Sequence, residues 1–171
     1  GRGLRVIGTA STPRKRDFAL ANGAHEVIEG DAHVLTEKVM QLTAGRGVDL
    51  AFDHLGGELF MACLRALAPF GMVVSYNIVN GPPAGDVFGE LRKLLSRSLA
   101  VRTFSIHSVD DDVPQRRGLM EAAIALMAEG RVHAPPATCF ALADARRAHE
   151  LLDSGSALGK IVLLPPDGPR H

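Results

Sequence analysis

The chain has 171 residues, which is long enough for one domain with a sizeable buried core. Its 19 Lys and Arg residues balance 19 Asp and Glu residues, and it contains no Trp. A neutral chain without a basic stripe and regularly spaced aromatic residues is not typical of a nucleic-acid-binding protein. No apolar run reaches the length of a membrane span and the first residues do not read as a signal sequence, so we expect a cytoplasmic protein with no membrane partner.

Strands and helices alternate along most of the chain. Short apolar runs bounded by turn residues predict strands near residues 4–10, 24–28, 48–52, 72–76 and 99–106. Apolar positions at helical spacing predict helices near residues 13–21, 33–43, 58–68, 88–95 and 113–130. Thr12 and Pro13 are typical of the start of the first of these helices, and Pro69 to Gly71 are expected to end the third. The pattern predicts an α/β fold with a doubly wound parallel sheet of the Rossmann type.

The glycine-rich phosphate-binding turn of that fold is missing. No G-x-G-x-x-G follows any predicted strand, and Gly45 and Gly47 precede a strand and lack the third glycine. We therefore expect a Rossmann-type sheet that lacks its first strand and its glycine-rich turn.

The strand predicted at residues 48–52 runs directly into an acid, a histidine and two glycines. Val48, Leu50, Ala51 and Phe52 are apolar, with β-forming residues among them, which indicates a strand covered on both faces. Gly56 and Gly57 allow a sharp turn or a close approach to a ligand. Ligands of parallel sheets lie beyond the carboxyl ends of the strands, so Asp53 and His54 are expected to meet a bound molecule. Alternatively, Asp53 only caps the helix that follows.

Cysteines and clustered acids give no sign of a metal site. Cys63 and Cys139 match neither a disulfide framework nor a metal-ligand spacing, and we interpret both as small buried hydrophobic residues. The three adjacent acids at 110–112 cannot all face one ion, so they are interpreted as the start of a helix.

The chain changes in character after about residue 131. Two adjacent prolines, a short apolar run, an amphipathic helix at 142–153 and a strand at 159–164 follow. We therefore divide the chain into a partial dinucleotide-binding domain at 1–131 and a C-terminal segment at 132–171, with a flexible tail at 165–171.

Seven segments follow one another in a familiar order: Arg-Val-Ile-Gly-Thr-Ala-Ser at 5–11, Asn-Gly-Ala at 22–24, Gly-Arg-Gly-Val-Asp at 45–49, Asp-His-Leu-Gly-Gly at 53–57, Val-Ser-Tyr at 74–76, Asp-Ala-Arg-Arg-Ala-His at 144–149 and Gly-Lys-Ile-Val-Leu at 159–163. Together they resemble the zinc-independent quinone oxidoreductases of the medium-chain dehydrogenase/reductase superfamily. The resemblance extends to about residue 165.

The resemblance implies that the chain corresponds to the C-terminal, cofactor-binding half of such an enzyme. The family's catalytic domain, first strand and glycine-rich turn have no counterpart here. The segment 132–171 resembles the part that returns toward the catalytic domain. We therefore expect either a fragment of a longer protein or a rearranged, weakened fold.

By the same resemblance the cofactor is NADPH. Small polar and basic residues that accept a 2'-phosphate follow the family's second strand, where an acid would favour NAD. Here those residues are Thr9, Ser11, Arg14 and Lys15, with no acid before Asp17. Lys15 matches a lysine that the family uses for this phosphate; alternatively, it belongs to a solvated basic helix face.

Four more residues are implied at the other end of the cofactor. Asp53 and His54 stand where the family turns toward the ribose and nicotinamide, and Tyr76 and Asn77 follow the next strand at the nicotinamide level. His54 is an alternative catalytic acid, but the family relies on positioning for hydride transfer, so no catalytic residue is assigned.

The implied function is hydride transfer from NADPH to a quinone or another conjugated carbonyl compound, without a metal. One alternative is an enoyl-thioester reductase of the same superfamily, and another is a non-catalytic dinucleotide-binding or dimerisation module. The expected partners are the small-molecule substrate and a second copy, joined through the edge strand 99–106 with Arg102 and Phe104 at the interface.

Overall fold

The computed structural model describes residues 3–166, which form two compact units. One unit comprises Arg5–Leu119, and the other contains the described residues from Met120 onward. Residues 167–171, which make up most of the predicted tail at 165–171, lie outside the described part of the chain.

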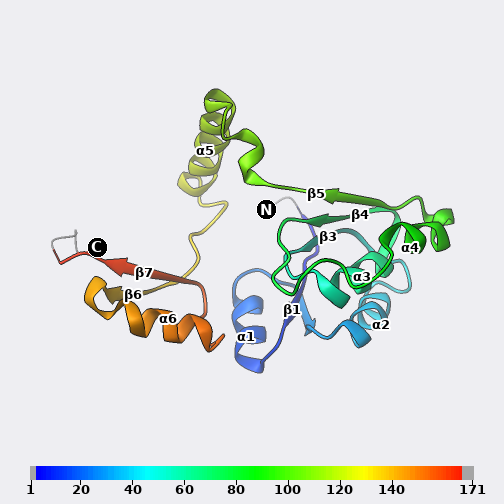
Figure 1. Cartoon of the computed structure of the whole chain (residues 1–171), viewed down its shortest axis with the longest axis horizontal. Coiled ribbons are helices and arrows are strands. Elements are labelled where there is room, and N and C mark those ends of the chain that lie inside the picture. The colour runs from blue at the N-terminus through cyan, green and yellow to red at the C-terminus, as the bar shows by residue number, and fades with distance from the viewer. Residues whose placement is uncertain (1–2, 167–171) are drawn as a thin grey trace. The chain divides into compact units, whose positions relative to one another are not determined.

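The Arg5–Leu119 unit alternates parallel strands with helices (Figure 1). Its elements are β1 (Ile7–Ala10), α1 (Pro13–Ala21), β2 (Glu26–Glu29), α2 (Ala32–Leu42), β3 (Val48–Asp53), α3 (Gly57–Arg65), β4 (Leu67–Ser75), α4 (Val87–Lys93), η1 (Leu95–Arg97), β5 (Ala100–Thr103), η2 (Ile106–Val109) and the start of α5 (Val113–Ala128). β1 pairs with β2, and β3, β4 and β5 form a second sheet in that order. Every pair is parallel, which confirms the predicted α/β class.

The core of this unit lies between the strands and helices α2 and α3. Phe60, Leu64, Leu67 and Val73 are almost fully buried in one cluster. A neighbouring cluster contains two residues each of α2 and the α3 region: Leu35, Val39, Ala62 and Ala66. Burial of each large apolar side chain stabilises the fold by about 1.5–3 kcal/mol, so these helices fix one face of the sheet.

Side-chain caps start the helices where the sequence predicts them. The Thr12 hydroxyl accepts the backbone N–H of Lys15 at 3.2 Å, and Pro13 occupies the first turn of α1. Asp31 caps α2 in the same way by accepting the N–H of His33 at 2.8 Å. The predicted start of the first helix is therefore confirmed. It places Lys15 in the first turn of α1, shortly after the end of β1.

Two predicted boundaries are wrong. α3 ends at Arg65, and β4 already begins at Leu67, so that Pro69 to Gly71 lie inside a strand. The β3–β4 register shifts between Val48 and Leu50, and Phe70 has a φ of 62°, so the turn residues form a bulge instead of ending the helix.

The edge strand β5 is also shorter than the predicted range of 99–106. It ends at Thr103, because the Ser105 hydroxyl caps a short 3-10 helix by accepting the N–H of His107.

The second unit contains a small parallel β–α–β arrangement. β6 (Ala137–Ala141) pairs in parallel with β7 (Lys160–Leu164), and η3 (Leu142–Asp144) and α6 (Ala145–Asp153) connect them. Ala148 of α6 is buried, and α6 contacts both strands. The predicted helix and last strand are therefore present, with the strand beginning one residue later than expected.

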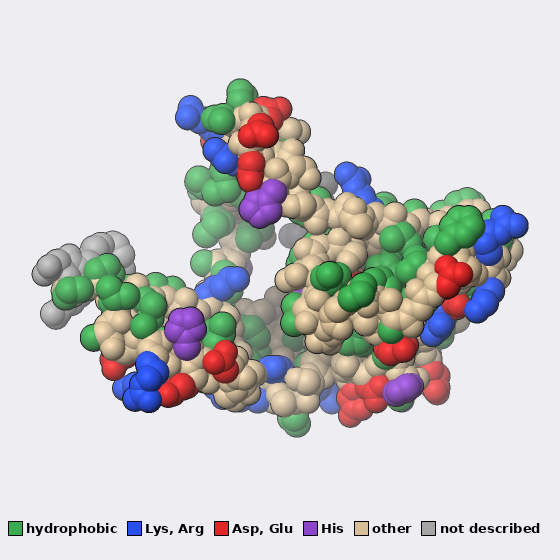
Figure 2. Space-filling view, viewed as in Figure 1, with side chains coloured by type: hydrophobic (Ala, Val, Ile, Leu, Met, Phe, Trp, Pro, Cys, Tyr) green, Lys and Arg blue, Asp and Glu red, His purple; other side chains and the backbone are tan. Residues whose placement is uncertain are grey.

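The surface carries dispersed charge. Figure 2 shows Lys and Arg side chains interspersed with Asp and Glu side chains over the visible face. Among the described helices, none combines the length and apolar character needed to cross a membrane.

Candidate functional site

The loops after β3 and β4 are joined by backbone hydrogen bonds. The N–H of Tyr76 donates to the carbonyl of Asp53 at 3.0 Å, and the N–H of Asn80 donates to the carbonyl of Leu55 at 2.7 Å. These bonds bring together four of the predicted site residues, Asp53, His54, Tyr76 and Asn77, at the carboxyl end of the sheet.

Asp53 is turned into the protein. Its side chain is buried, with 4% exposed, and its carboxylate accepts the backbone N–H groups of Leu55 at 3.2 Å and Gly56 at 3.1 Å. An unsatisfied carboxylate would be costly at this depth, and these donors offset that cost. The contacts thus give Asp53 the role of holding the turn before α3. It does not cap that helix, whose N-cap is Gly56 without a side-chain hydrogen bond, so the alternative interpretation is wrong, and direct binding of a cofactor by Asp53 stays a prediction.

Gly56 makes the sharp turn possible. Its φ is 73°, and a Cβ at this position would lie 2.0 Å from the carbonyl oxygen of Gly81. Only glycine permits this close approach between the two loops. The predicted turn at Gly56 is confirmed.

His54 and Tyr76 form an exposed aromatic pair on these loops. Their ring centroids are 5.9 Å apart and their planes are inclined by 26°. The neighbouring Asn77 side chain is occupied locally, since its Oδ1 accepts the N–H of Ile78 at 2.9 Å. The loops therefore present one stacked surface on which a planar ring could lie.

A small hollow lies at the carboxyl ends of β1 and β2. It has a volume of about 160 Å³ and is lined by Ala10, Ser11, Thr12, Pro13, Arg16, Val27, Ile28 and Glu29. Nζ of Lys15 lies 3.4 Å from Oγ of Ser11 and donates to it. Ser11 and Lys15 are thus together. Of the four residues predicted here, Ser11 lines the hollow, and Thr9, Arg14 and Lys15 do not.

Arg16 and Glu29 line this hollow but were not among the predicted site residues. The basic run of residues 14–16 contained the signal for Arg16, but a sequence does not show which of three adjacent cations faces a hollow. Glu29 comes from β2, and only the parallel pairing of Ala10 with Glu29 brings it to this position.

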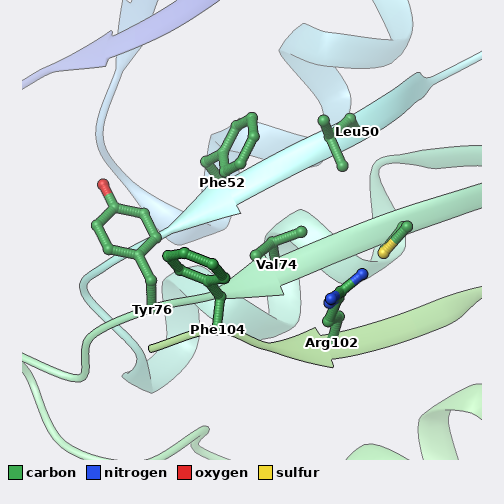
Figure 3. Close-up of a pocket in the computed structure, with 7 residues that line it drawn as sticks. Leu50, Phe52, Val74, Tyr76, Arg102 and Phe104 are labelled. Atoms are coloured by element: carbon green, nitrogen blue, oxygen red, sulfur yellow. The ribbon is translucent and has the colours of Figure 1, made fainter. Parts of the chain in front are cut away.

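One face of the β3–β4–β5 sheet forms an open apolar hollow of about 610 Å³ (Figure 3). Its lining side chains alternate along the three strands and continue into Tyr76: Leu50, Phe52, Met72, Val74, Tyr76, Arg102 and Phe104. The Phe52 residue is 66% exposed and Leu50 is 44% exposed. The expectation that β3 is covered on both faces is therefore wrong for the structure described: Val48 and Ala51 pack against the helical core, and Leu50 and Phe52 point into the hollow.

The two cysteines differ. Burial raises the pKa of the Cys63 thiol to about 11, and the negative charge of Asp53 adds to the effect. Cys139 is exposed, so the expectation that it is buried is wrong: it lies on a strand of a two-stranded sheet that leaves its side chain accessible. Within residues 3–166, no three His, Cys, Asp or Glu side chains are grouped for metal binding.

Parallel strands, helices between them and polar loops at the strands' carboxyl ends define a Rossmann-like α/β half of the dehydrogenase type. Comparison with known families agrees with this class. The chain belongs to the zinc-binding dehydrogenase family, whose model matches residues 22–163.

Several relatives of the chain are quinone oxidoreductases. The chain is 31% identical over 163 residues to the quinone oxidoreductase of Pseudomonas aeruginosa, covering 95% of this chain and 50% of the relative. A crystal structure of the Pseudomonas syringae pv. tomato enzyme matches with a TM-score of 0.82 at 28% identity, again over 95% of this chain and 50% of that one. The Escherichia coli quinone oxidoreductase complexed with NADPH matches with a TM-score of 0.79 at 31% identity, with the same coverage.

The chain therefore spans about half the length of the relatives it matches. The resemblance to the cofactor-binding half of quinone oxidoreductases is confirmed, and so is the Rossmann-type fold.

Proposed function

We propose that this chain forms the cofactor-binding half of an NADPH-dependent oxidoreductase that transfers hydride to a quinone or another conjugated carbonyl compound. The observation that carries the proposal is the hydrogen bond from Lys15 to Ser11 at the carboxyl end of β1, 3.4 Å long, beside a hollow that Ser11 and Arg16 line.

This end of the site suits a phosphate. Lys15 and Arg16 supply positive charge, and the Ser11 hydroxyl supplies a hydrogen-bond donor. The positive end of α1 begins at Pro13, which adds to the attraction for an anion. Glu29 lines the hollow from the opposite strand and opposes this charge in part. The balance favours a 2'-phosphate because Arg16 in the hollow, Lys15 beside it on Ser11 and the N-terminus of α1 together outweigh one carboxylate.

The other end of the site suits a planar ring. The stacked rings of His54 and Tyr76 lie where the loops after β3 and β4 meet. When bound, NADPH supplies the hydride, and the protein contributes position and surroundings. In this proposal Tyr76 and His54 orient the nicotinamide end, Asn77 borders it, and Asp53 holds the loop.

A comparison of two nucleotide fragments tests the phosphate end without any catalysis. We expect 2',5'-ADP to bind the chain at least about tenfold more tightly than 5'-AMP, since the charge-assisted contacts to the 2'-phosphate contribute about 1.4 kcal/mol or more. Isothermal titration calorimetry measures both. Equal affinities for the two fragments would contradict the proposed selectivity.

We also propose that two copies join through the outer edge of β5, which pairs only with β4 among the described strands. The N–H of Phe104 donates to Ser75 on β4, so the backbone of Val101, three residues earlier, faces the open edge. Val101→Pro removes an edge donor. It should convert a dimer to a monomer in sedimentation velocity, and a monomeric wild-type chain would refute the edge contact.

Three further predictions complete the proposal. We infer that the protein works in the cytoplasm. Its two free cysteines support this inference, because the cytoplasm is a reducing compartment in which disulfides are rare. Independence from zinc and the division into a cofactor domain at 1–131 and a returning segment at 132–171 stay predictions. Metal analysis of purified protein and limited proteolysis test them.

A further inference from the structure

No acid follows β1 at the position where a dinucleotide-binding sheet often carries one. In such sheets an Asp or Glu after the second strand accepts a hydrogen bond from the ribose 2'-hydroxyl and so favours NAD. Here β1 ends at Ala10, and the residues from Ser11 to Arg16 include three cations and no acid. The residues after β1 therefore contain nothing that favours a 2'-hydroxyl over a 2'-phosphate.

The pairing of β1 with β2 brings an acid to this place from the neighbouring strand. Glu29 is the last residue of β2 and is the partner of Ala10, the last residue of β1. The N–H of Gly30 donates to the carbonyl of Ala10 at 3.2 Å, so the two strands stay paired to their ends. Glu29 thereby lines the hollow of about 160 Å³ at the carboxyl ends of both strands.

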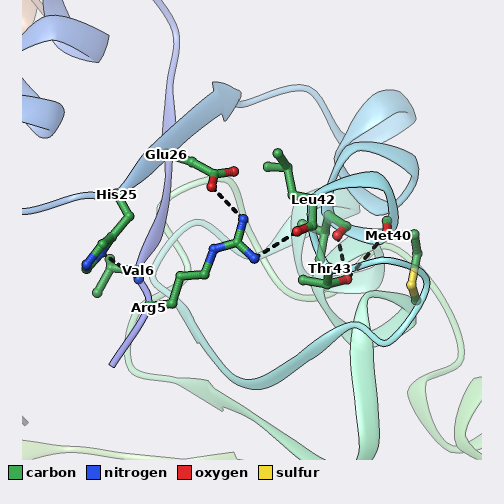
Figure 4. A network of polar contacts seen from close by, with 8 residues as sticks. Arg5, Val6, His25, Glu26, Met40, Leu42 and Thr43 are labelled. Atoms are coloured by element: carbon green, nitrogen blue, oxygen red, sulfur yellow. Dashed lines mark hydrogen bonds and ion pairs between the residues drawn. The ribbon is translucent and has the colours of Figure 1, made fainter. Parts of the chain in front are cut away.

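The register that places this acid is fixed at the opposite end of the two strands (Figure 4). The N–H of Val6 donates to Nδ1 of His25 at 3.0 Å. Arg5 donates from Nη1 to the carbonyl of Leu42 at 2.8 Å and from Nη2 to Oε1 of Glu26. A slip of one residue would turn every side chain of β2 to the other face of the sheet. These contacts oppose such a slip and so hold the end of β2 at the hollow.

The hollow presents two charged side chains that are available to a ligand. Arg16 lines it from α1, and Glu29 lines it from β2. Within residues 3–166 neither side chain takes part in an ion pair, whereas Glu26, the other charged residue at an end of β2, pairs with Arg5. Both Arg16 and Glu29 are exposed. A bound nucleotide can therefore meet a guanidinium and a carboxylate in the same hollow.

These two groups act with opposite sign on the choice between the two nicotinamide cofactors. The cofactors differ by a hydroxyl or a phosphate at the 2'-position. A guanidinium bonds strongly to a phosphate, whereas a carboxylate repels it. A carboxylate in turn accepts a hydrogen bond from a hydroxyl, which a guanidinium, having donors alone, answers less well. Arg16 thus favours the phosphorylated nucleotide, and Glu29 favours the other.

We propose that Glu29 is a specificity-determining residue that supplies from β2 the acid missing after β1. It bonds the 2'-hydroxyl of NADH and repels the 2'-phosphate of NADPH. It therefore holds the preference for NADPH below the level that Lys15 and Arg16 alone would set, and NADH is a second cofactor that the site accepts. This inference rests on the proposed function, because it assumes that the adenosine end of the cofactor lies in this hollow.

Calorimetric titration of the chain with 2',5'-ADP and with 5'-AMP tests the role of Glu29. Glu29→Gln removes the charge but keeps an oxygen that accepts a hydrogen bond. It should bind 2',5'-ADP about threefold to tenfold more tightly, since one repulsion between like charges is lost, and 5'-AMP within about twofold of the unchanged chain. Glu29→Ala also removes the acceptor and should bind 5'-AMP about twofold to tenfold more weakly.

A matched variant separates a local effect from the change in net charge. Glu37→Gln removes the same charge from α2, and Glu37 is exposed and does not line the hollow. Its affinity for either fragment should stay within about twofold of that of the unchanged chain. Circular dichroism checks that all three variants fold.

The ratio of the two affinities in each protein decides the outcome. An unchanged ratio in Glu29→Gln, or equal tightening of both fragments, would overturn the role of Glu29 while a tenfold ratio in the unchanged chain still supported the proposed function. Equal affinities in the unchanged chain with a raised ratio in Glu29→Gln would support the role of Glu29 and contradict the proposed selectivity. Equal affinities in both proteins would overturn both.

Discussion

The imidazole of His54 stacks on the phenol ring of Tyr76, with their centroids 5.9 Å apart. The two residues come from different strands and meet because the loops after β3 and β4 are hydrogen bonded to each other. Both rings are exposed, so the pair forms a surface rather than part of the core.

Tyr76 should act through its ring rather than through its hydroxyl. Tyr76→Phe keeps the stack and should leave NADPH affinity within about twofold, while Tyr76→Ala should weaken it about threefold to tenfold, because an aromatic contact contributes about 0.5–1.5 kcal/mol. Calorimetric titration of both variants measures the difference. Equal weakening in both would instead point to the hydroxyl.

Gly56 should tolerate no side chain. In Gly56→Ala the new Cβ meets the carbonyl of Gly81 and the residue must keep a positive φ, so the free energy of unfolding should fall by about 2 kcal/mol or more. Gly118→Ala is the control, because Gly118 lies within α5 with nothing near its Cβ position. That variant should be neutral or up to about 1 kcal/mol more stable. Urea unfolding compares them, and a stable Gly56→Ala protein would show that the loops separate easily.

Cys63 should give stability a dependence on alkaline pH. Its pKa is raised from 9.0 to about 11, so the thiol ionises more readily in the unfolded chain than in the folded one. The stabilising contribution is complete below pH 9 and is lost as the pH rises through about 11. Cys63→Ala should flatten the decline of the unfolding free energy over this range, whereas Cys139→Ala should not. The same slope in all three proteins would contradict the burial of this thiol.

Glu90 should stabilise the fold above acid pH. Hydrogen bonds from Arg65 at 2.7 Å and Lys93 at 3.2 Å hold the pKa of its carboxyl below the usual value. Its contribution is therefore present above the ordinary pKa of a glutamate and is lost as the pH falls through the lowered one. Glu90→Gln should cost about 1–3 kcal/mol at pH 7 and less in acid. The exposed Glu121→Gln is the control, and a loss of stability that does not change with pH would argue against the ion pairs.

The fold class could be read from the sequence because strand and helix periods alternate and the caps are local. Thr12 and Pro13 specify the start of α1 through contacts that lie between residues 12 and 15. The bulge at Phe70 could not be read in this way, since Pro69 and Gly71 are turn signals that the pairing of β4 with β3 overrides. Here the hydrogen bonds between β3 and β4 determine the backbone conformation against the local turn preference of Pro69 and Gly71.

The site was predictable in part for similar reasons. Ligands of parallel sheets lie beyond the carboxyl ends of the strands, so Asp53 and His54 could be named from position alone, whereas Tyr76 was named from the family resemblance. The inward turn of the Asp53 carboxylate depends on the N–H groups of the following turn, and the place of Glu29 depends on strand register. Neither is visible until the strands are paired.

The most direct test of the account is calorimetric titration of the chain with NADPH and with NADH, alongside Lys15→Ala and the control Lys38→Ala on α2. The account predicts that NADPH binds at least about tenfold more tightly than NADH, that Lys15→Ala removes most of this preference by weakening NADPH alone, and that Lys38→Ala preserves it. Equal affinity for the two nucleotides, or a preference that survives the loss of Lys15, would contradict the assignment of this site to the 2'-phosphate.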